Sequence, residues 1–171
     1  TAITLLLIIR LMSRLVVELL PNSSRALCLS LAILALPPIL IYPSAKRWCP
    51  FPQAFLAICW GFAVLIPWAA SQGNLAGGMP LVGTWAATLL WTFGFDTVYA
   101  IADQTDDQKL GLNSSVISLG KKAKHIVAFS YGLTSLFLAN AAIFKGVSWI
   151  FWPFWFIAGI GMQREIFTLN Y

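Results

Sequence analysis

Long stretches without a charged residue are the feature of this 171-residue sequence that most restricts its fold. They run over residues 26–45, 50–94, 125–144 and 146–163. An α-helix needs about 20 apolar residues to cross the roughly 30 Å hydrocarbon core of a bilayer. The stretches are continuous and do not alternate in polarity, which favours helices over the strands of a barrel. The sequence therefore predicts an all-α fold, a polytopic transmembrane helix bundle.

Composition supports a membrane location. Hydrophobic residues make up 59% of the chain and charged residues only 10%, with a mean hydropathy of +0.80. Soluble domains carry about 25% charged residues. The net charge is +5, but no basic block is long enough for a nucleic-acid tail, so we expect the lipid bilayer and no nucleic acid as a partner.

Six membrane spans are expected, near residues 3–20, 26–42, 53–71, 81–101, 125–144 and 147–167. The connections 43–52 and 102–124 together hold six Lys and Arg residues, whereas the opposite connections hold only Arg25 and Lys145. By the positive-inside rule, the two basic connections face the cytoplasm. We therefore expect a protein of the bacterial inner (cytoplasmic) membrane with these loops on its cytoplasmic side.

The first expected span is less regular than the others. Arg10, Arg14 and Glu18 interrupt it at intervals of four residues, which places them on one stripe of a helix. An interfacial or tilted helix is therefore an alternative to a full span in this segment.

Acidic residues concentrate at the end of one apolar run. Four of the six in the chain fall within twelve positions, as Asp96, Asp103, Asp106 and Asp107. On a continuous helix, at about 100° per residue, positions 96, 103 and 107 lie within about 40° of one another. Asp96 stands on the apolar side of the helix exit, where a carboxylate is costly unless a cation meets it. The pattern predicts a metal site for Mg²⁺, with a solvated helix exit as the alternative.

A phosphorylated substrate follows from the expected metal. Mg²⁺ usually keeps waters and binds one or two carboxylates together with substrate phosphates. Tyr42 ends one expected span, and Lys46 and Arg47 lie in the connection after it. All three are expected at the same membrane face, where the two cations suit a diphosphate. The alternative is that Lys46 and Arg47 serve only as topological anchors.

Two motifs resemble those of a known family. The run Asp96-x-x-Tyr99-Ala100-x-x-Asp103-x-x-Asp106-Asp107, with Lys109-Leu110-Gly111 and Asn113-Ser114-Ser115 after it, resembles the second aspartate motif of UbiA-type intramembrane aromatic prenyltransferases. Tyr42-x-x-x-Lys46 resembles their YxxxK motif. The surrounding Pro52-Gln53, Gly61 and Pro67 resemble the pattern of 4-hydroxybenzoate polyprenyltransferases. The resemblance begins near residue 24 and implies part of a nine-helix fold.

The resemblance implies a reaction and a role for each motif residue. Such enzymes bind a polyprenyl diphosphate through Mg²⁺ held by two aspartate motifs, and transfer the polyprenyl group to an aromatic acceptor. The implied acceptor is 4-hydroxybenzoate, in ubiquinone or plastoquinone biosynthesis. By motif match, the metal ligands are Asp103 and Asp107, supported by Asp96 and Asp106; the diphosphate-binding cations are Lys46, Arg47 and Lys109; and the catalytic side chains are Lys46, Tyr42 and Tyr99.

The sequence also departs from the family pattern. It contains no first aspartate motif of the NDxxDxxxD kind and no counterpart of the last helix. Residues 1–171 are thus expected to be a single transmembrane domain, an internal fragment covering the third to eighth helices and inactive by itself. Three alternatives remain: a different aromatic acceptor (homogentisate, a naphthoate, chlorophyllide or haem), a non-catalytic remnant, and a transporter with Asp96 as its cation site.

Overall fold

Helices account for nearly all of the structure, a computed structural model that describes residues 22–168 except the side chains of Ser23 and Phe167. The expected span 3–20 lies outside the described residues. The long helices are α2 (Asn22–Ala45), α3 (Pro52–Gln72), α4 (Gly78–Ala102), α7 (Ala123–Lys145) and α8 (Phe151–Thr168). Between α4 and α7 lie α5 (Gln104–Lys109), α6 (Ser115–Leu119) and a 3-10 turn (Gly120–Lys122). The described part contains no strand, so the predicted all-α class is confirmed.

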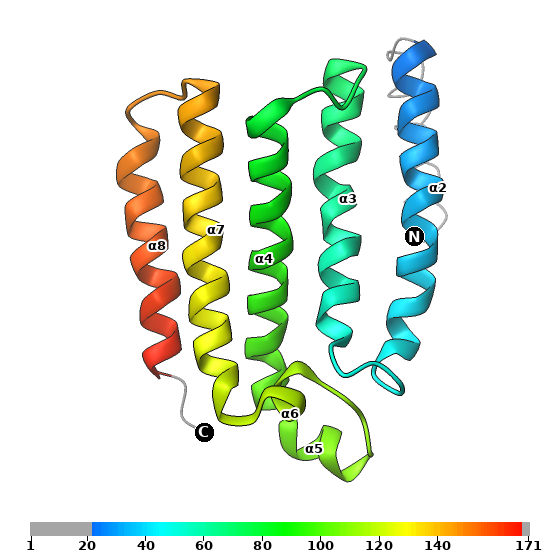
Figure 1. The fold of residues 1–171 in the computed structure, drawn as a ribbon, viewed down its shortest axis with the longest axis vertical. Coiled ribbons are helices and arrows are strands. Elements are labelled where there is room, and N and C mark those ends of the chain that lie inside the picture. Colours follow the sequence, from blue (N-terminus) through cyan, green and yellow to red (C-terminus); the bar gives the residue numbers. More distant parts are fainter. Residues whose placement is uncertain (1–21, 169–171) are drawn as a thin grey trace, which may run out of the picture.

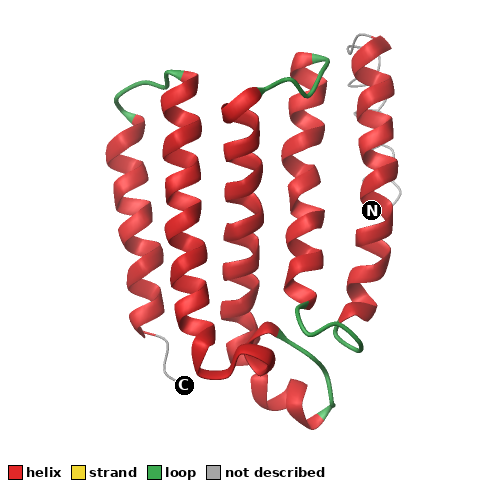
Figure 2. Cartoon of the chain, viewed as in Figure 1, coloured by secondary structure: helices red, strands yellow, loops and turns green. Residues whose placement is uncertain are grey.

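The long helices stand in one row in chain order, each antiparallel to the next (Figure 1). Short loops join all of them except α4 and α7, and the connection between those two carries the small helices α5 and α6 at one end of the row (Figure 2). The two basic connections meet at that end, where the Asn113 backbone N–H donates to the Lys46 carbonyl at 2.7 Å. For the five spans in the described residues, the structure thus confirms the expected alternation and the shared side of the two connections.

Small residues bring α4 and α7 close together. A Cβ atom added to Gly83 would lie 2.9 Å from the Phe137 carbonyl oxygen. One added to Gly94 would lie 2.7 Å from the Tyr131 ring. Glycines at such positions let membrane helices approach until their backbones touch. This contact makes α4 and α7 the tightly packed centre of the row.

Large apolar side chains cover the outer faces of the row. On α2, for example, Leu29, Leu34 and Leu40 are 61–73% exposed, far beyond what a soluble surface tolerates as a continuous patch. By length and composition, three segments of the described part are apolar enough to cross a membrane: Ser24–Ala45, Pro52–Gln72 and Ser115–Lys145. Helix α4, which carries Asp96 and four threonines, is not among these three segments.

Candidate functional site

A cavity of about 360 Å³ opens where α2, α3 and α4 meet, at the end of the row that holds the basic connections. Its lining combines carboxylates, a cation, an amide and aromatic rings: Tyr42, Lys46, Gln53, Phe95, Asp96, Tyr99, Ala100 and Asp103. The fold therefore brings together five of the predicted site residues: Tyr42, Lys46, Asp96, Tyr99 and Asp103. They come from two motifs about 50 residues apart in the chain.

Asp107 pairs with Lys46 at the edge of this cavity. Lys46 Nζ lies 3.2 Å from each carboxylate oxygen of Asp107. The Asp107 side chain is only 7% exposed, whereas that of Lys46 is 35% exposed and reaches the cavity. A buried carboxylate requires such a partner, because an unpaired charge away from water is costly. Asp107 therefore holds the ammonium group of Lys46 beside the cavity.

The aspartates do not share one continuous helix, which differs from the expected helical phase. Helix α4 ends at Ala102, and the separate helix α5 begins after Asp103. Asp103 remains at the cavity, but Asp107 turns to Lys46 and is not among the lining residues. The break has a simple physical reason. Helix α5 consists of polar residues throughout, so it does not continue the apolar helix α4 and lies instead with the connections at the end of the row.

Three other predicted site residues lie outside the cavity. Asp106 and Lys109 form an ion pair at 3.1 Å, in which both side chains are about three-quarters exposed. Arg47 is exposed on the connection between α2 and α3, and it does not line the cavity. These side chains face water close to the site and do not contact its interior.

The donor set at the cavity fits Mg²⁺ that shares a phosphorylated ligand. Among residues 22–168, no three His, Cys, Asp or Glu side chains gather closely enough to hold a metal on their own. Asp96 and Asp103 nevertheless both line the cavity. One or two carboxylates completed by phosphate oxygens and water is the usual protein environment of Mg²⁺. These residues do not provide a complete set of protein ligands for the metal.

Buried polar contacts fix the walls of the cavity. The Ser115 backbone N–H donates to Gln53 Oε1 at 3.0 Å, and the Ser115 and Thr97 hydroxyl oxygens lie 2.8 Å apart. All three side chains are at most 2% exposed. The contacts join the start of α3, the C-terminal part of α4 and the start of α6. Sequence reasoning assigned no role to Gln53 or Thr97, although polar residues in so apolar a chain are a usable signal.

An aromatic row leads from the cavity along α4. The Trp91 and Phe95 rings are stacked with centroids 5.0 Å apart, and the Phe95 and Tyr99 centroids are 4.7 Å apart. These rings are spaced four residues apart on one face of the helix. They are 38%, 39% and 59% exposed, so this face is open to an apolar ligand.

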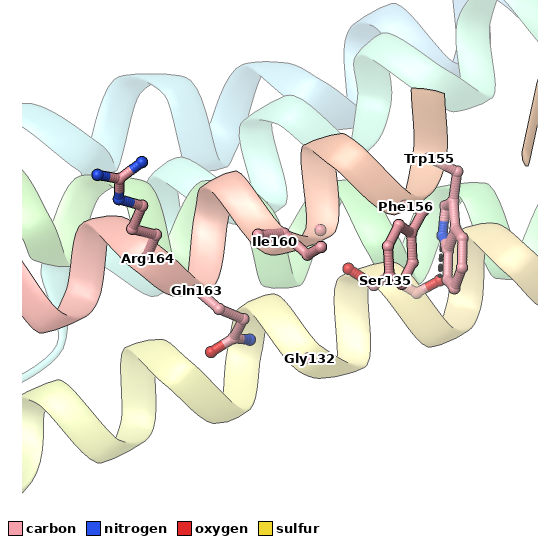
Figure 3. Close-up of a pocket in the computed structure, with 8 residues that line it drawn as sticks. Gly132, Ser135, Trp155, Phe156, Ile160, Gln163 and Arg164 are labelled. Carbon is pink, nitrogen blue, oxygen red and sulfur yellow. Dashed lines mark hydrogen bonds between the residues drawn. The ribbon is translucent and has the colours of Figure 1, made fainter. Parts of the chain in front are cut away.

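A larger groove lies elsewhere, between α7 and α8. It has a volume of about 510 Å³, and Figure 3 shows Trp155 beside Ser135, whose carbonyl accepts its indole N–H at 2.9 Å. Its polar members are Ser135, Gln163 and Arg164, and no carboxylate lines it. The smaller cavity, which holds the acidic residues and Lys46, is therefore the better candidate site.

The long apolar helices stand in one row, and the acidic cavity lies at the end of the row that holds the basic connections. These features define an integral membrane protein. A profile of the UbiA prenyltransferase family matches residues 1–170. The chain belongs to the UbiA prenyltransferase family.

Curated relatives share a named activity. A 4-hydroxybenzoate solanesyltransferase of a Synechocystis species is 41% identical over 140 residues, which cover 82% of this chain and 47% of the relative. A 4-hydroxybenzoate octaprenyltransferase of Neisseria meningitidis is 34% identical over 113 residues, covering 66% and 38%. That of Thiobacillus denitrificans is 33% identical over 141 residues, covering 82% and 46%. The chain spans less than half the length of these relatives, and no solved structure matches it.

Proposed function

We propose that the complete protein is an enzyme that transfers a polyprenyl group from a polyprenyl diphosphate to 4-hydroxybenzoate, in ubiquinone or plastoquinone biosynthesis. One observation carries the proposal: a single cavity gathers Asp96, Asp103 and Lys46 at the end of the helix row that holds the basic connections. Its carboxylates suit Mg²⁺ and its cation suits a diphosphate. The names of the curated relatives support the acceptor and the polyprenyl donor.

The proposed metal ligands are Asp103 and Asp107, with Asp96 and Asp106 as supporting carboxylates. Asp96 and Asp103 already line the cavity, whereas Asp107 would exchange its partner Lys46 for the metal. When bound there, Mg²⁺ would neutralise negative charge on the diphosphate. The carboxylates of the chain provide the fixed negative charge that keeps the cation at the cavity.

Lys46 is proposed to bind the departing diphosphate. Its ammonium group carries up to three N–H donors, and Asp107 holds it at the cavity edge. Once Asp107 turns to the metal, the released ammonium group can donate to the diphosphate oxygens and stabilise the charge that develops as the diphosphate leaves. Arg47 and Lys109 stand in water near the cavity, so their role is to attract the anionic substrate from a distance.

The aromatic row supports binding of the polyprenyl chain. Tyr99 and Phe95 line the cavity, and Trp91 extends the aromatic surface toward the middle of α4. Tyr42, in α2, lines the same cavity. The faces of aromatic rings are electron-rich and attract cations. We infer that Tyr99 and Tyr42 flank the allylic carbon at which positive charge develops, with the apolar chain lying along Phe95 and Trp91.

The membrane orientation and the domain assignment belong to the same proposal. Six Lys and Arg residues in the connections at the cavity end favour a cytoplasmic position in a bacterial inner membrane. The part of the relatives that this chain does not span would supply the first aspartate motif and complete the single transmembrane domain. We therefore expect residues 1–171 alone to be inactive.

The test is an assay of the full-length protein in membrane vesicles. Radiolabelled 4-hydroxybenzoate and a polyprenyl diphosphate should give a labelled lipid product with Mg²⁺ present, and none with EDTA. Homogentisate and dihydroxynaphthoate serve as competing acceptors in parallel reactions. Transfer to one of these and not to 4-hydroxybenzoate would overturn the acceptor, and absence of any prenyl transfer would overturn the proposed activity.

A further inference from the structure

Gln53 is a buried polar side chain that lines the candidate cavity. It lies at the start of α3, directly after Pro52, and is 2% exposed. Its Oε1 accepts the backbone N–H of Ser115 at 3.0 Å, a contact between residues 62 positions apart. A glutamine buried this deeply is expected to use all of its polar atoms, because each unsatisfied buried group is costly.

The Ser115 contact fixes which way the amide points. A backbone N–H can only donate, so the atom that meets it has to be the amide oxygen and not the nitrogen. Nε2 and its two N–H donors then lie on the other branch of the amide. No described residue accepts a hydrogen bond from Nε2, and the atom is not sealed inside the protein either. The donors therefore face the cavity and are available to a ligand.

The neighbours of Gln53 indicate the chemistry of that ligand. Lys46 lines the same cavity and its backbone is tied to the same segment, since Asn113 N–H donates to the Lys46 carbonyl. Asp96 and Asp103 line the same cavity and make it acidic. A neutral N–H donor at this place binds an anionic oxygen without competing with a metal cation for the carboxylates. A carboxylate side chain at position 53 would instead repel the anion.

We propose that the Gln53 amide donates a hydrogen bond to a diphosphate oxygen of the polyprenyl diphosphate, and so positions the leaving group beside Lys46. The inference rests on the proposed function for the identity of the ligand. It assigns Gln53 two separate tasks: Oε1 holds the start of α6 in place, and Nε2 binds substrate. The two tasks can be separated by substitution.

The decisive variant is Gln53→Glu in the full-length protein. It keeps an oxygen for Ser115 N–H but replaces the N–H donors with a second oxygen. Gln53→Met removes both functions at similar volume. Ser118→Ala is the matched control, because Ser118 Oγ donates to the Pro50 carbonyl at 2.7 Å and so joins the same two segments without lining the cavity. Heating in detergent micelles reports whether each variant is folded.

The probe is farnesyl thiodiphosphate, a donor analogue that resists transfer, titrated with Mg²⁺ present. Loss of a hydrogen bond to a charged group should weaken its binding to Gln53→Met about 10- to 100-fold, and Gln53→Glu, which also repels the anion, should bind it more weakly still. Ser118→Ala should bind as the wild type does. In the transfer assay, the KM for the polyprenyl diphosphate should rise and the KM for 4-hydroxybenzoate should not.

Three results separate this inference from the proposed function. Wild-type affinity in a folded Gln53→Glu variant would overturn the inference and show that Gln53 is only structural. A rise confined to the KM for 4-hydroxybenzoate would also overturn it, because Gln53 would then bind the acceptor. If the wild type binds the thiodiphosphate but transfers nothing to an aromatic ring, while folded Gln53→Met and Gln53→Glu both bind it weakly, the inference stands and the proposed activity fails.

Discussion

Lys46 Nζ lies 3.2 Å from both carboxylate oxygens of Asp107, although the two residues are 61 positions apart in the sequence. The pair joins the end of α2 to α5, and Lys46 also lines the cavity. Asp107 of the aspartate motif therefore orients the ammonium group of Lys46, which belongs to the YxxxK motif.

Removing Lys46 should destabilise the protein, because it leaves the Asp107 carboxylate buried without a partner. We expect Lys46→Met to lower the free energy of unfolding by about 2 kcal/mol, a value reduced from that of a fully buried pair since Lys46 is one-third exposed. Lys109→Met is the matched control: its pair with Asp106 is exposed, so the change should stay within about 0.5 kcal/mol. Equal unfolding temperatures of the two variants in detergent would contradict this account.

Trp91 should contribute to the binding of long polyprenyl chains. It continues the aromatic surface of Phe95 and Tyr99 away from the cavity, so a short chain would not reach it. Trp91→Ala should therefore raise the KM for a long-chain diphosphate about tenfold, the effect of losing roughly 1.4 kcal/mol of apolar contact, and leave that for dimethylallyl diphosphate nearly unchanged. An equal rise for both donors would show that the row does not bind the chain.

Packing between α4 and α7 should be sensitive to the size of residue 83. A side chain at Gly83 would meet the Phe137 carbonyl at 2.9 Å, and a backbone atom cannot move aside easily. Gly83→Val should lower the stability by about 1–3 kcal/mol. Gly161→Ala serves as the comparison because a Cβ there meets nothing within 4 Å. If both variants unfold at the wild-type temperature, the α4–α7 contact is looser than described.

Orientation can be tested by cysteine labelling. In a variant with Cys28, Cys49 and Cys59 replaced by alanine, Lys122→Cys lies at the cavity end and Ser148→Cys at the opposite end of the row. A membrane-impermeant maleimide should label residue 122 in inside-out vesicles and residue 148 in right-side-out vesicles. The reverse pattern would place the cavity outside the cytoplasm.

The sequence predicted the helices well because their signal is physical and local. Uncharged runs of spanning length located α2, α3, α4, α7 and α8 to within a few residues at most ends. The charge distribution predicted that Lys46 and Asp103 lie at the same end, and the cavity between α2 and α4 confirms it.

Side-chain contacts were harder to predict because they depend on loop geometry. Helical phase predicted that Asp107 shares a face with Asp96 and Asp103, but the chain changes direction after Asp103 and turns Asp107 to Lys46. The role of Gln53 was also missed. Its partner Ser115 is 62 positions away, and no periodicity in the sequence connects the two residues.

Prenyl transfer by aspartate variants of the full-length protein tests the central claim most directly. Asp103→Ala and Asp107→Ala should each lower the rate of Mg²⁺-dependent transfer to radiolabelled 4-hydroxybenzoate on the order of 10²–10³-fold, because charge on the diphosphate loses its stabilisation. Lys122→Ala, at an exposed position outside the cavity, should retain wild-type activity. Undiminished product from folded Asp103→Ala and Asp107→Ala proteins would contradict the account.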